Sequence, residues 1–152
     1  MSADPMPTTS ARDLARLVDI LAERSKDRVA TVLSAHGLTP TDWQVLKVVA
    51  HAENPGPTAV WEWTGMPRAT ITDALTRLEA RGLCTRLPDG GDRRRWRLKV
   101  TEDGRDLVRT LPALIERAAT SYLERLSQEE LALGRALLET AASMHPSATS
   151  RA

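Results

Sequence analysis

The stretch 65–100, GMPRATITDALTRLEARGLCTRLPDGGDRRRWRLKV, decides the fold of this chain. Pro67 is expected to open a helix, and Gly82 is expected to end it. The apolar side chains of this helix recur on one face, at Ile71, Leu75 and Leu78. Two alternating apolar and polar runs follow, 83–87 and 96–100, with a turn rich in Pro, Asp and Gly between them. The stretch therefore predicts a helix followed directly by a β-hairpin.

A short helix is expected just upstream, from Thr58 to Thr64, and Gly65 ends it. Two helices joined by a turn that contains Gly form a helix-turn-helix. The hairpin that follows is then the wing of a winged helix-turn-helix, which spans residues 38–101. The predicted fold class is mainly α with a small β-hairpin wing.

Longer helices are expected on the N-terminal side of this domain. Ser10 and Asp13 have the spacing of an N-terminal cap, and they precede a helix over about 11–35 that Gly37 closes. The run Thr39-Pro40-Thr41-Asp42 combines a capping Thr, a Pro in the first turn and an acid that returns the capping bond. It predicts the start of a second helix.

Two more helices are expected after the hairpin. Thr101 caps the first of them, whose apolar face extends to Leu123, and Pro112 predicts a kink or a break within it. The run Ser127-Gln128-Glu129-Glu130 has the spacing of a capping box and opens the last helix.

Composition narrows the class of protein. The chain has 152 residues, 41% hydrophobic and 27% charged, which fits one soluble domain. The sequence has no membrane-spanning apolar run, no secretory start and a single cysteine, so we expect a protein of the reducing cytoplasm. It also has no glycine-rich phosphate loop, no nucleophile elbow and no histidine pair at metal-ligand spacing. We therefore expect neither an enzyme nor a cofactor.

Charge is unevenly distributed, although the formal net charge is only +1. Residues 67–100 contain nine basic and four acidic side chains, so this segment carries +5 and the remainder carries −4. A basic module within an acidic frame favours a polyanion as the partner of that one region. A solvated, arginine-rich hairpin explains the same count, and charge alone does not separate the two interpretations.

The predicted helix over 67–80 carries a possible DNA-reading face opposite its apolar residues. Small side chains let a helix enter the major groove, Thr can bond a base edge or touch a thymine methyl, and Arg can reach guanine or phosphate. The candidate DNA contacts on this helix are Arg68, Ala69, Thr70, Thr72, Asp73, Thr76 and Arg77. Asp73 suits this role only if it meets a cytosine amine or pairs with a neighbouring Arg. A solvated helix face is the alternative.

The hairpin tip gives a more specific signal. Asp92, Arg93, Arg94 and Arg95 follow two glycines, and the mutual repulsion of three adjacent arginines is hard to explain by stability. Arginines on an extended tip suit insertion into a narrow, negative minor groove. Asp92 could orient one of them through a bidentate bond. Charge that protects an edge strand is the alternative explanation.

These motifs, taken in order, resemble the MarR (multiple antibiotic resistance regulator) family of bacterial transcription factors over about 38–107. The matching pieces are Leu38-Thr39-Pro40, Gly65-Met66-Pro67-Arg68, Leu78-Glu79-Ala80-Arg81-Gly82-Leu83, Asp92-Arg93-Arg94 and Thr101-Glu102-Asp103-Gly104. The resemblance implies a homodimeric repressor. The N- and C-terminal helices of two chains would interlock, and each winged domain would bind a pseudo-palindromic operator in double-stranded DNA.

The resemblance also implies a division of the chain. Residues 11–36 and 102–144 would form the helical dimerisation region, in agreement with their long Leu/Ala stripes, which one small winged domain cannot cover. Residues 38–101 would be the DNA-binding domain. Residues 1–10 are expected to be a disordered N-terminus and 145–152 a loose tail.

Many relatives in this family release DNA when a small aromatic or phenolic molecule binds between the dimer helices and the winged domain. By position, Arg16, His36 and Trp43 are candidates for lining such a pocket. His36 could instead bond the free carbonyls at the end of its helix. The resemblance implies a location in the bacterial cytoplasm with the nucleoid, and no membrane partner.

The chain departs from the family pattern at Trp61, where Ala is usual. We interpret Trp43, Trp61 and Trp63 as core or half-buried fillers, and Trp96 as packing back on the domain. Cys84 lies in the first wing strand and not near the first helix, where some relatives carry an oxidant-sensing cysteine, so a buried inert thiol is favoured.

One competing function uses the same fold. A winged helix can bind a protein, or can track DNA as an architectural module without any effector. A wing that binds protein is expected to be more apolar and less charged than this one. The arginines of the wing therefore favour DNA.

Overall fold

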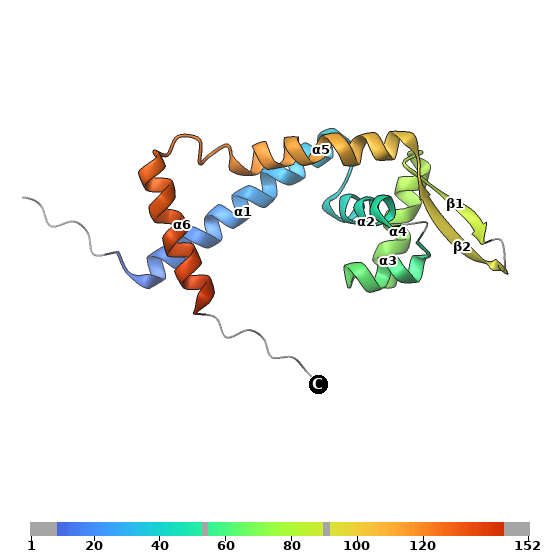
Figure 1. Ribbon diagram of the computed structural model, residues 1–152, viewed down its shortest axis with the longest axis horizontal. Coiled ribbons are helices and arrows are strands. Elements are labelled where there is room, and N and C mark those ends of the chain that lie inside the picture. The colour runs from blue at the N-terminus through green and yellow to red at the C-terminus, as the bar shows by residue number, and fades with distance from the viewer. Residues whose placement is uncertain (1–8, 53–54, 90–91, 145–152) are drawn as a thin grey trace, which may run out of the picture. The chain divides into compact units, whose positions relative to one another are not determined.

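The computed structural model describes residues 9–52, 55–89 and 92–144 (Figure 1). Its element order confirms the predicted class, mainly α with a two-stranded antiparallel wing. The helices before the wing are α1 (Ala11–Ala35), α2 (Pro40–His51), α3 (Pro57–Thr64) and α4 (Arg68–Ala80). The wing and the helices after it are β1 (Cys84–Asp89), β2 (Asp92–Val100), α5 (Glu102–Thr120) and α6 (Gln128–Ser143).

The predicted helix starts are confirmed by their capping bonds. Ser10, Thr39 and Ser127 each accept a hydrogen bond from the backbone N–H three residues on, and the acid at that position returns the bond. Each exchange satisfies two backbone donors that the first turn of a helix otherwise leaves free. The short polar motifs therefore predict correctly the residue at which α1, α2 and α6 each begin.

The core of the winged domain is formed where α2, α4 and the wing meet. Helix α2 contributes Val45, Leu46 and Val49, and α4 contributes Ile71, Ala74, Leu75 and Leu78. Val60 of α3 and Leu98 of β2 are fully enclosed by the same cluster. Leu33 of α1 and Leu111 of α5 extend it, so one continuous core holds α4 with one face inward.

The wing is longer than predicted. Strand β1 pairs with β2 from Cys84 opposite Val100 to Pro88 opposite Trp96, and a register shift follows before Asp89. The expectation that Pro88 and Asp89 belong to the turn is therefore wrong. In a two-stranded ribbon every strand has one free edge. A proline whose nitrogen faces that edge breaks no hydrogen bond between the strands, so the strand tolerates it.

The sequence predicted a kink or a break at Pro112; helix α5 is continuous through this residue, so the break does not occur. A proline in a helix loses one backbone hydrogen bond and crowds the preceding turn. Its neighbour Leu111 is fully buried in the core, which helps to hold the helix in place. The helix ends at Thr120, which is short of the predicted Leu123.

The chain divides into two compact units, Met1–Ala119 and Thr120–Ala152. The first contains α1 to α4, the wing and most of α5, whereas α6 belongs to the second. None of the helices in the described ranges is long and apolar enough to cross a membrane.

The start of α5 is joined closely to the start of β1. Thr101 Oγ1 donates to the carbonyl of Gly82 (2.7 Å) and accepts from the backbone N–H of Gly104 (3.1 Å). The backbone of α5 then passes so near β1 that a Cβ on Gly104 would overlap the carbonyl oxygen of Leu83. The same Cβ would lie 2.8 Å from Val100 Cγ2. This close approach explains why the Thr-x-x-Gly motif ends in glycine.

Gly104→Ala is expected to lower the free energy of unfolding by about 1–3 kcal/mol, because the new methyl group meets backbone that cannot move aside freely. Urea denaturation measures the change. Gly134→Ala in α6 is the matched control: its Cβ meets nothing within 4 Å, and Ala is the better helix former, so stability should stay equal or rise. Equal effects of the two substitutions would contradict the close approach.

Candidate DNA interface

Helix α4 presents two faces of opposite character. Its buried side is entirely apolar, with Ile71, Ala74, Leu75 and Leu78. Six of the seven predicted DNA-contacting residues of this helix are exposed, and Thr70 is partly buried. The predicted residues thus lie on the exposed side of α4, opposite its apolar face.

Two threonines of this face have their hydroxyl hydrogens engaged. Thr72 Oγ1 donates to the carbonyl of Arg68, and Thr76 Oγ1 donates to the carbonyl of Thr72, both at 2.9 Å. A hydroxyl held in this way keeps its lone pairs and its neighbouring methyl group for other contacts. Such a surface can accept from the amino groups of adenine or cytosine and can touch a thymine methyl.

Arg77 is tied into the framework of the domain. Its Nε and Nη2 atoms donate to Oδ1 of Asp42 at 3.0 and 2.7 Å. Asp42 is the capping acid at the start of α2, and only 3% of its side chain is exposed, whereas 47% of the Arg77 side chain is exposed. The pair joins α2 to the outward face of α4. Sequence reasoning found both residues but not their contact, because 35 positions separate them.

The environment of Asp42 acts on its pKa in two directions. Burial alone would raise the pKa of this carboxyl group, because the interior disfavours its charged form. Hydrogen bonds from Arg77 and Thr39 favour the carboxylate and outweigh burial, so the pKa lies below its usual value. Asp42 is therefore a charged anchor for Arg77 at neutral pH.

Arg68, at the start of α4, has a different partner. Its guanidinium carbon lies 4.9 Å from the centre of the Trp61 ring in α3.

Trp61 is 37% exposed, as expected of a half-buried side chain, and Trp43 is buried in the core. Trp63 is 63% exposed, so the expectation of a core or half-buried filler is wrong for this residue. It lies beside the polar face of α2 next to Gln44 and Lys47, which leave it open to water.

The wing is held against the loop that leads into α3. The backbone N–H of Leu98 donates to the carbonyl of Pro55 at 2.9 Å. Arg97 Nε lies 3.0 Å from Asp89 Oδ1, so a salt bridge crosses the hairpin. Asp92, Arg93, Arg94 and Arg95 lie in β2, and their side chains are outside the described residues.

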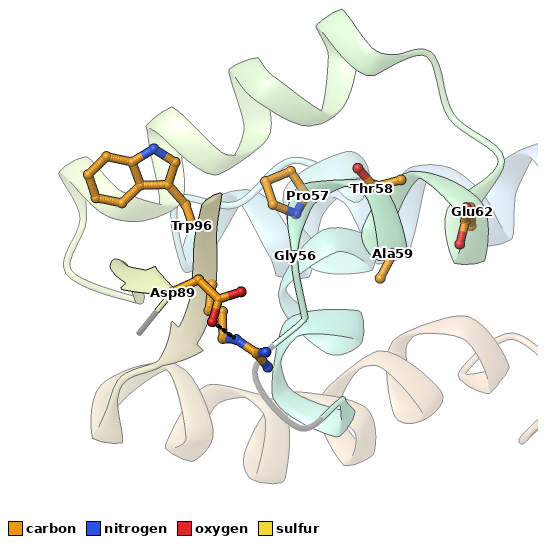
Figure 2. Close-up of a pocket in the computed structure, with 8 residues that line it drawn as sticks. Gly56, Pro57, Thr58, Ala59, Glu62, Asp89 and Trp96 are labelled. Carbon is orange, nitrogen blue, oxygen red and sulfur yellow. Dashed lines mark hydrogen bonds and ion pairs between the residues drawn. The ribbon is translucent and has the colours of Figure 1, made fainter. Parts of the chain in front are cut away.

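A recess of about 640 Å³ separates the start of α3 from the wing. Figure 2 shows Trp96 and Asp89 on the wing side of it and Pro57 and Thr58 on the side of α3. Trp96 is 47% exposed, so it covers the domain with part of its ring only. Asp89 and Glu62 line the recess together with Arg97, which pairs with Asp89, so the recess offers a phosphate no net positive charge.

The three residues suggested for an effector pocket have separate surroundings. Arg16 is exposed on α1. His36 Nδ1 lies 2.9 Å from the carbonyl of Val32, at the end of α1, in agreement with the helix-end alternative. Trp43 is 7% exposed in the core, and the ammonium group of Lys47 lies 5.6 Å from its ring centre.

Cys84 is buried at the first position of β1. Burial raises the pKa of its thiol to about 11, with a further upward contribution from Glu79 and an opposing one from Arg86. The thiolate is the reactive form of cysteine, so this position suits an inert thiol.

Known proteins share this sequence pattern and this fold. Residues 36–95 match the sequence model of the MarR family. The PcaV transcriptional regulator from Streptomyces coelicolor is 27% identical, with a TM-score of 0.69, and the match covers 86% of this chain and 95% of PcaV.

Two further structures contain DNA. A mutant of MepR from S. aureus bound to an oligodeoxyribonucleotide is 21% identical, with a TM-score of 0.70 over 86% of this chain and 96% of that one. A mutant of MarR from E. coli complexed with operator DNA is 22% identical, with a TM-score of 0.62 over 84% and 92%. At these identities the two likenesses show the fold.

The helix pair α3–α4 and the hairpin after it define a winged helix-turn-helix protein. Its central 60 residues match the sequence model of the MarR family, and its fold is shared over most of its length with regulators such as PcaV.

Asp42→Asn is expected to lower the free energy of unfolding at pH 7 by about 2 kcal/mol, because a buried, charge-assisted bond is lost. The pKa of Asp42 is depressed in the folded chain, so its stabilisation is present above the unfolded pKa, about 3.9, and is lost as pH falls through the lower folded pKa. Urea denaturation at pH 7 and pH 3 should show the gap between wild type and variant narrow in acid.

Asp106→Asn is the control for that measurement. Asp106 also pairs with an arginine, Arg109, but 56% of its side chain is exposed. Exposed pairs contribute little, so this variant should differ from wild type by about 0.5 kcal/mol or less. A gap for Asp42→Asn that is small at pH 7, or that widens in acid, would count against the anchor.

Cys84 is expected to resist Ellman's reagent in the folded protein. With a pKa of about 11, roughly one thiol in a thousand is ionised at pH 8, and burial blocks access to it. The unfolded chain in urea should react at once, which provides the control. Native labelling as fast as that of the unfolded chain would show that the thiol is reactive.

Proposed function

We propose that this protein is a sequence-specific DNA-binding transcriptional regulator. The observation that carries the proposal is the outward face of α4, where small and polar side chains surround two arginines above a fully apolar inner face. The run of three arginines in β2 adds a basic wing beside it. The proposed DNA contacts are those predicted from the sequence, including Asp92 to Arg95 in the wing.

We further propose that the regulator is a homodimer. Helix α1 exposes a stripe of large apolar side chains, formed by Leu14, Leu17, Val18, Ile20 and Leu21. Helix α6 exposes Leu133, Leu137 and Leu138. Apolar area of this extent on a water-soluble protein usually marks an interface. The dimerisation region is then 11–36 with 102–144, and the DNA-binding domain is 38–101.

Repression and release by a small molecule are the finer part of the proposal. A dimer on a pseudo-palindromic operator that overlaps a promoter blocks transcription by occupancy, and an aromatic or phenolic effector would shift it to a form that binds DNA less tightly. A regulator of this kind acts where the DNA is, which in a bacterium is the cytoplasm.

The experiment is a salt titration of binding to a labelled duplex from the gene's own promoter, against a scrambled duplex. The proposed function predicts tight, sequence-selective binding that weakens steeply with salt, because each phosphate contact releases counterions. Sequence-blind binding would favour an architectural role. Absence of binding at low salt would favour a winged-helix module that binds protein.

Arg94→Ala should weaken binding to this duplex about tenfold or more, because an arginine in a narrow minor groove is strongly attracted by its negative potential. Fluorescence anisotropy measures the affinity, and sedimentation checks that the dimer is intact. Arg109→Ala in α5 is the control, since this arginine is 77% exposed and paired with Asp106. Equal affinities of Arg94→Ala and wild type would remove the wing from the interface.

Leu17→Glu is expected to convert the dimer to monomers, because it places a charge in the apolar stripe of α1. Sedimentation equilibrium measures the mass. Leu87→Glu is the matched control: Leu87 is 42% exposed, but it lies in the wing, so this variant should stay dimeric. A wild-type chain that sediments as a monomer would contradict the dimer hypothesis.

A further inference from the structure

Trp61 and Arg68 form a contact across the turn of the helix-turn-helix. Trp61 lies near the end of α3 and Arg68 is the first residue of α4. Gly65 between them has a φ of +66°, a left-handed conformation that lets the chain reverse direction in few residues. The reversal places the guanidinium carbon of Arg68 4.9 Å from the centre of the indole ring, within the range of a cation–π interaction.

The guanidinium carbon of Arg68 lies over the Trp61 ring, and a guanidinium that meets a ring through its face keeps the N–H donors of its edge for other partners. The N–H donors of arginine lie in the plane of the group, whereas the attraction to the indole acts through the face of that plane. Arg68 forms no salt bridge with a carboxylate of the described residues. Arg77 differs, because its Nε and Nη2 are both bonded to Asp42. Arg68 is thus positioned and still able to donate to a partner.

A small recess of about 180 Å³ lies beside this pair. Its lining is formed by Pro57, Thr58, Trp61, Arg68, Ile71 and Thr72. It therefore joins the start of α3 to the outward face of α4. Pro57 and Thr58 of the first turn of α3, which has no side-chain cap, line the recess on one side. The guanidinium of Arg68 on the other side suits an anion.

Burial gives only part of the reason for a tryptophan at position 61. More than a third of its surface remains in water, at 37%. A smaller apolar residue would fill the enclosed part of the site. An indole is the ring that attracts a cation most strongly, and stacking costs the guanidinium none of its donors. The ring at this position therefore has a contact with Arg68 besides its packing in the domain.

We propose that Trp61 is a positioning residue that holds Arg68 for a bidentate contact with a backbone phosphate of DNA. The inference rests on the proposed function and adds a residue that acts through another. Pre-orienting a long side chain reduces the conformational entropy lost on binding. Trp61 thereby raises affinity for DNA without itself bonding to it.

The test is a double-mutant cycle on affinity for the promoter duplex, with wild type, Trp61→Leu, Arg68→Ala and the double variant. Leucine keeps apolar volume and removes the ring. Trp61→Leu should weaken binding about threefold when Arg68 is present and should have no effect in the Arg68→Ala background. Trp63→Leu is the matched control: it removes an exposed ring from the same helix and should leave affinity unchanged.

Salt dependence identifies the group that Arg68 contacts. Loss of one phosphate contact should reduce the slope of log K against log salt by about one in Arg68→Ala. The slope should be unchanged in Trp61→Leu, because the contact still forms in the complex. An Arg68→Ala slope equal to that of wild type, with altered base preference, would overturn the phosphate assignment.

Two outcomes separate this inference from the proposed function. If wild type binds DNA and Trp61→Leu costs the same with or without Arg68, Trp61 has a structural role and the inference fails alone. If wild type does not bind DNA, the proposed function fails and the inference falls with it. If Trp61→Leu does not fold, Trp61→Met, which also has no ring, takes its place in the cycle. NMR of the free protein tests the stack directly, since the Arg68 side-chain protons should be shifted upfield by the indole ring; unshifted resonances would contradict it.

Discussion

The way in which α4 lies against α2 in the winged domain depends on the buried carboxylate of Asp42. It caps the start of α2 through the backbone N–H of Thr39 and accepts two hydrogen bonds from Arg77 of α4. One side chain thus fixes both where α2 begins and how α4 lies against it. The apolar cluster around Leu46 and Leu75 supplies most of the stabilisation, but apolar packing alone tolerates small rotations of a helix. A directional charge pair restricts them.

The orientation of α4 decides what the protein can offer to DNA. With its apolar side inward, Thr72 and Thr76 point outward, each with its hydroxyl hydrogen held by the backbone and its lone pairs available. The arginines of this helix then have different tasks. Arg77 is bonded to Asp42, whereas the guanidinium of Arg68 lies over an indole ring and forms no salt bridge with any residue that the structure describes. The two could not be told apart by their position in the sequence.

Local patterns in the sequence predict most of the fold but only part of the candidate site. Capping pairs three residues apart placed α1, α2 and α6, since a cap is a contact between near neighbours. The strand through Pro88 was missed, and the sequence left a kink or a break open at Pro112, because the free edge and the buried neighbour that permit these elements are features of the folded chain. The contacts of Asp42 with Arg77 and of Trp61 with Arg68 depend on the angle between helices, which no local pattern encodes.

The central claim is that two winged domains, related by symmetry, read one operator. Hydroxyl-radical footprinting of the promoter duplex tests it most directly, because it reports where each backbone sugar is protected. The account predicts two equivalent protected regions whose centres lie about one helical turn, or a multiple of it, apart. A single asymmetric region, or uniform protection along the duplex, would contradict it.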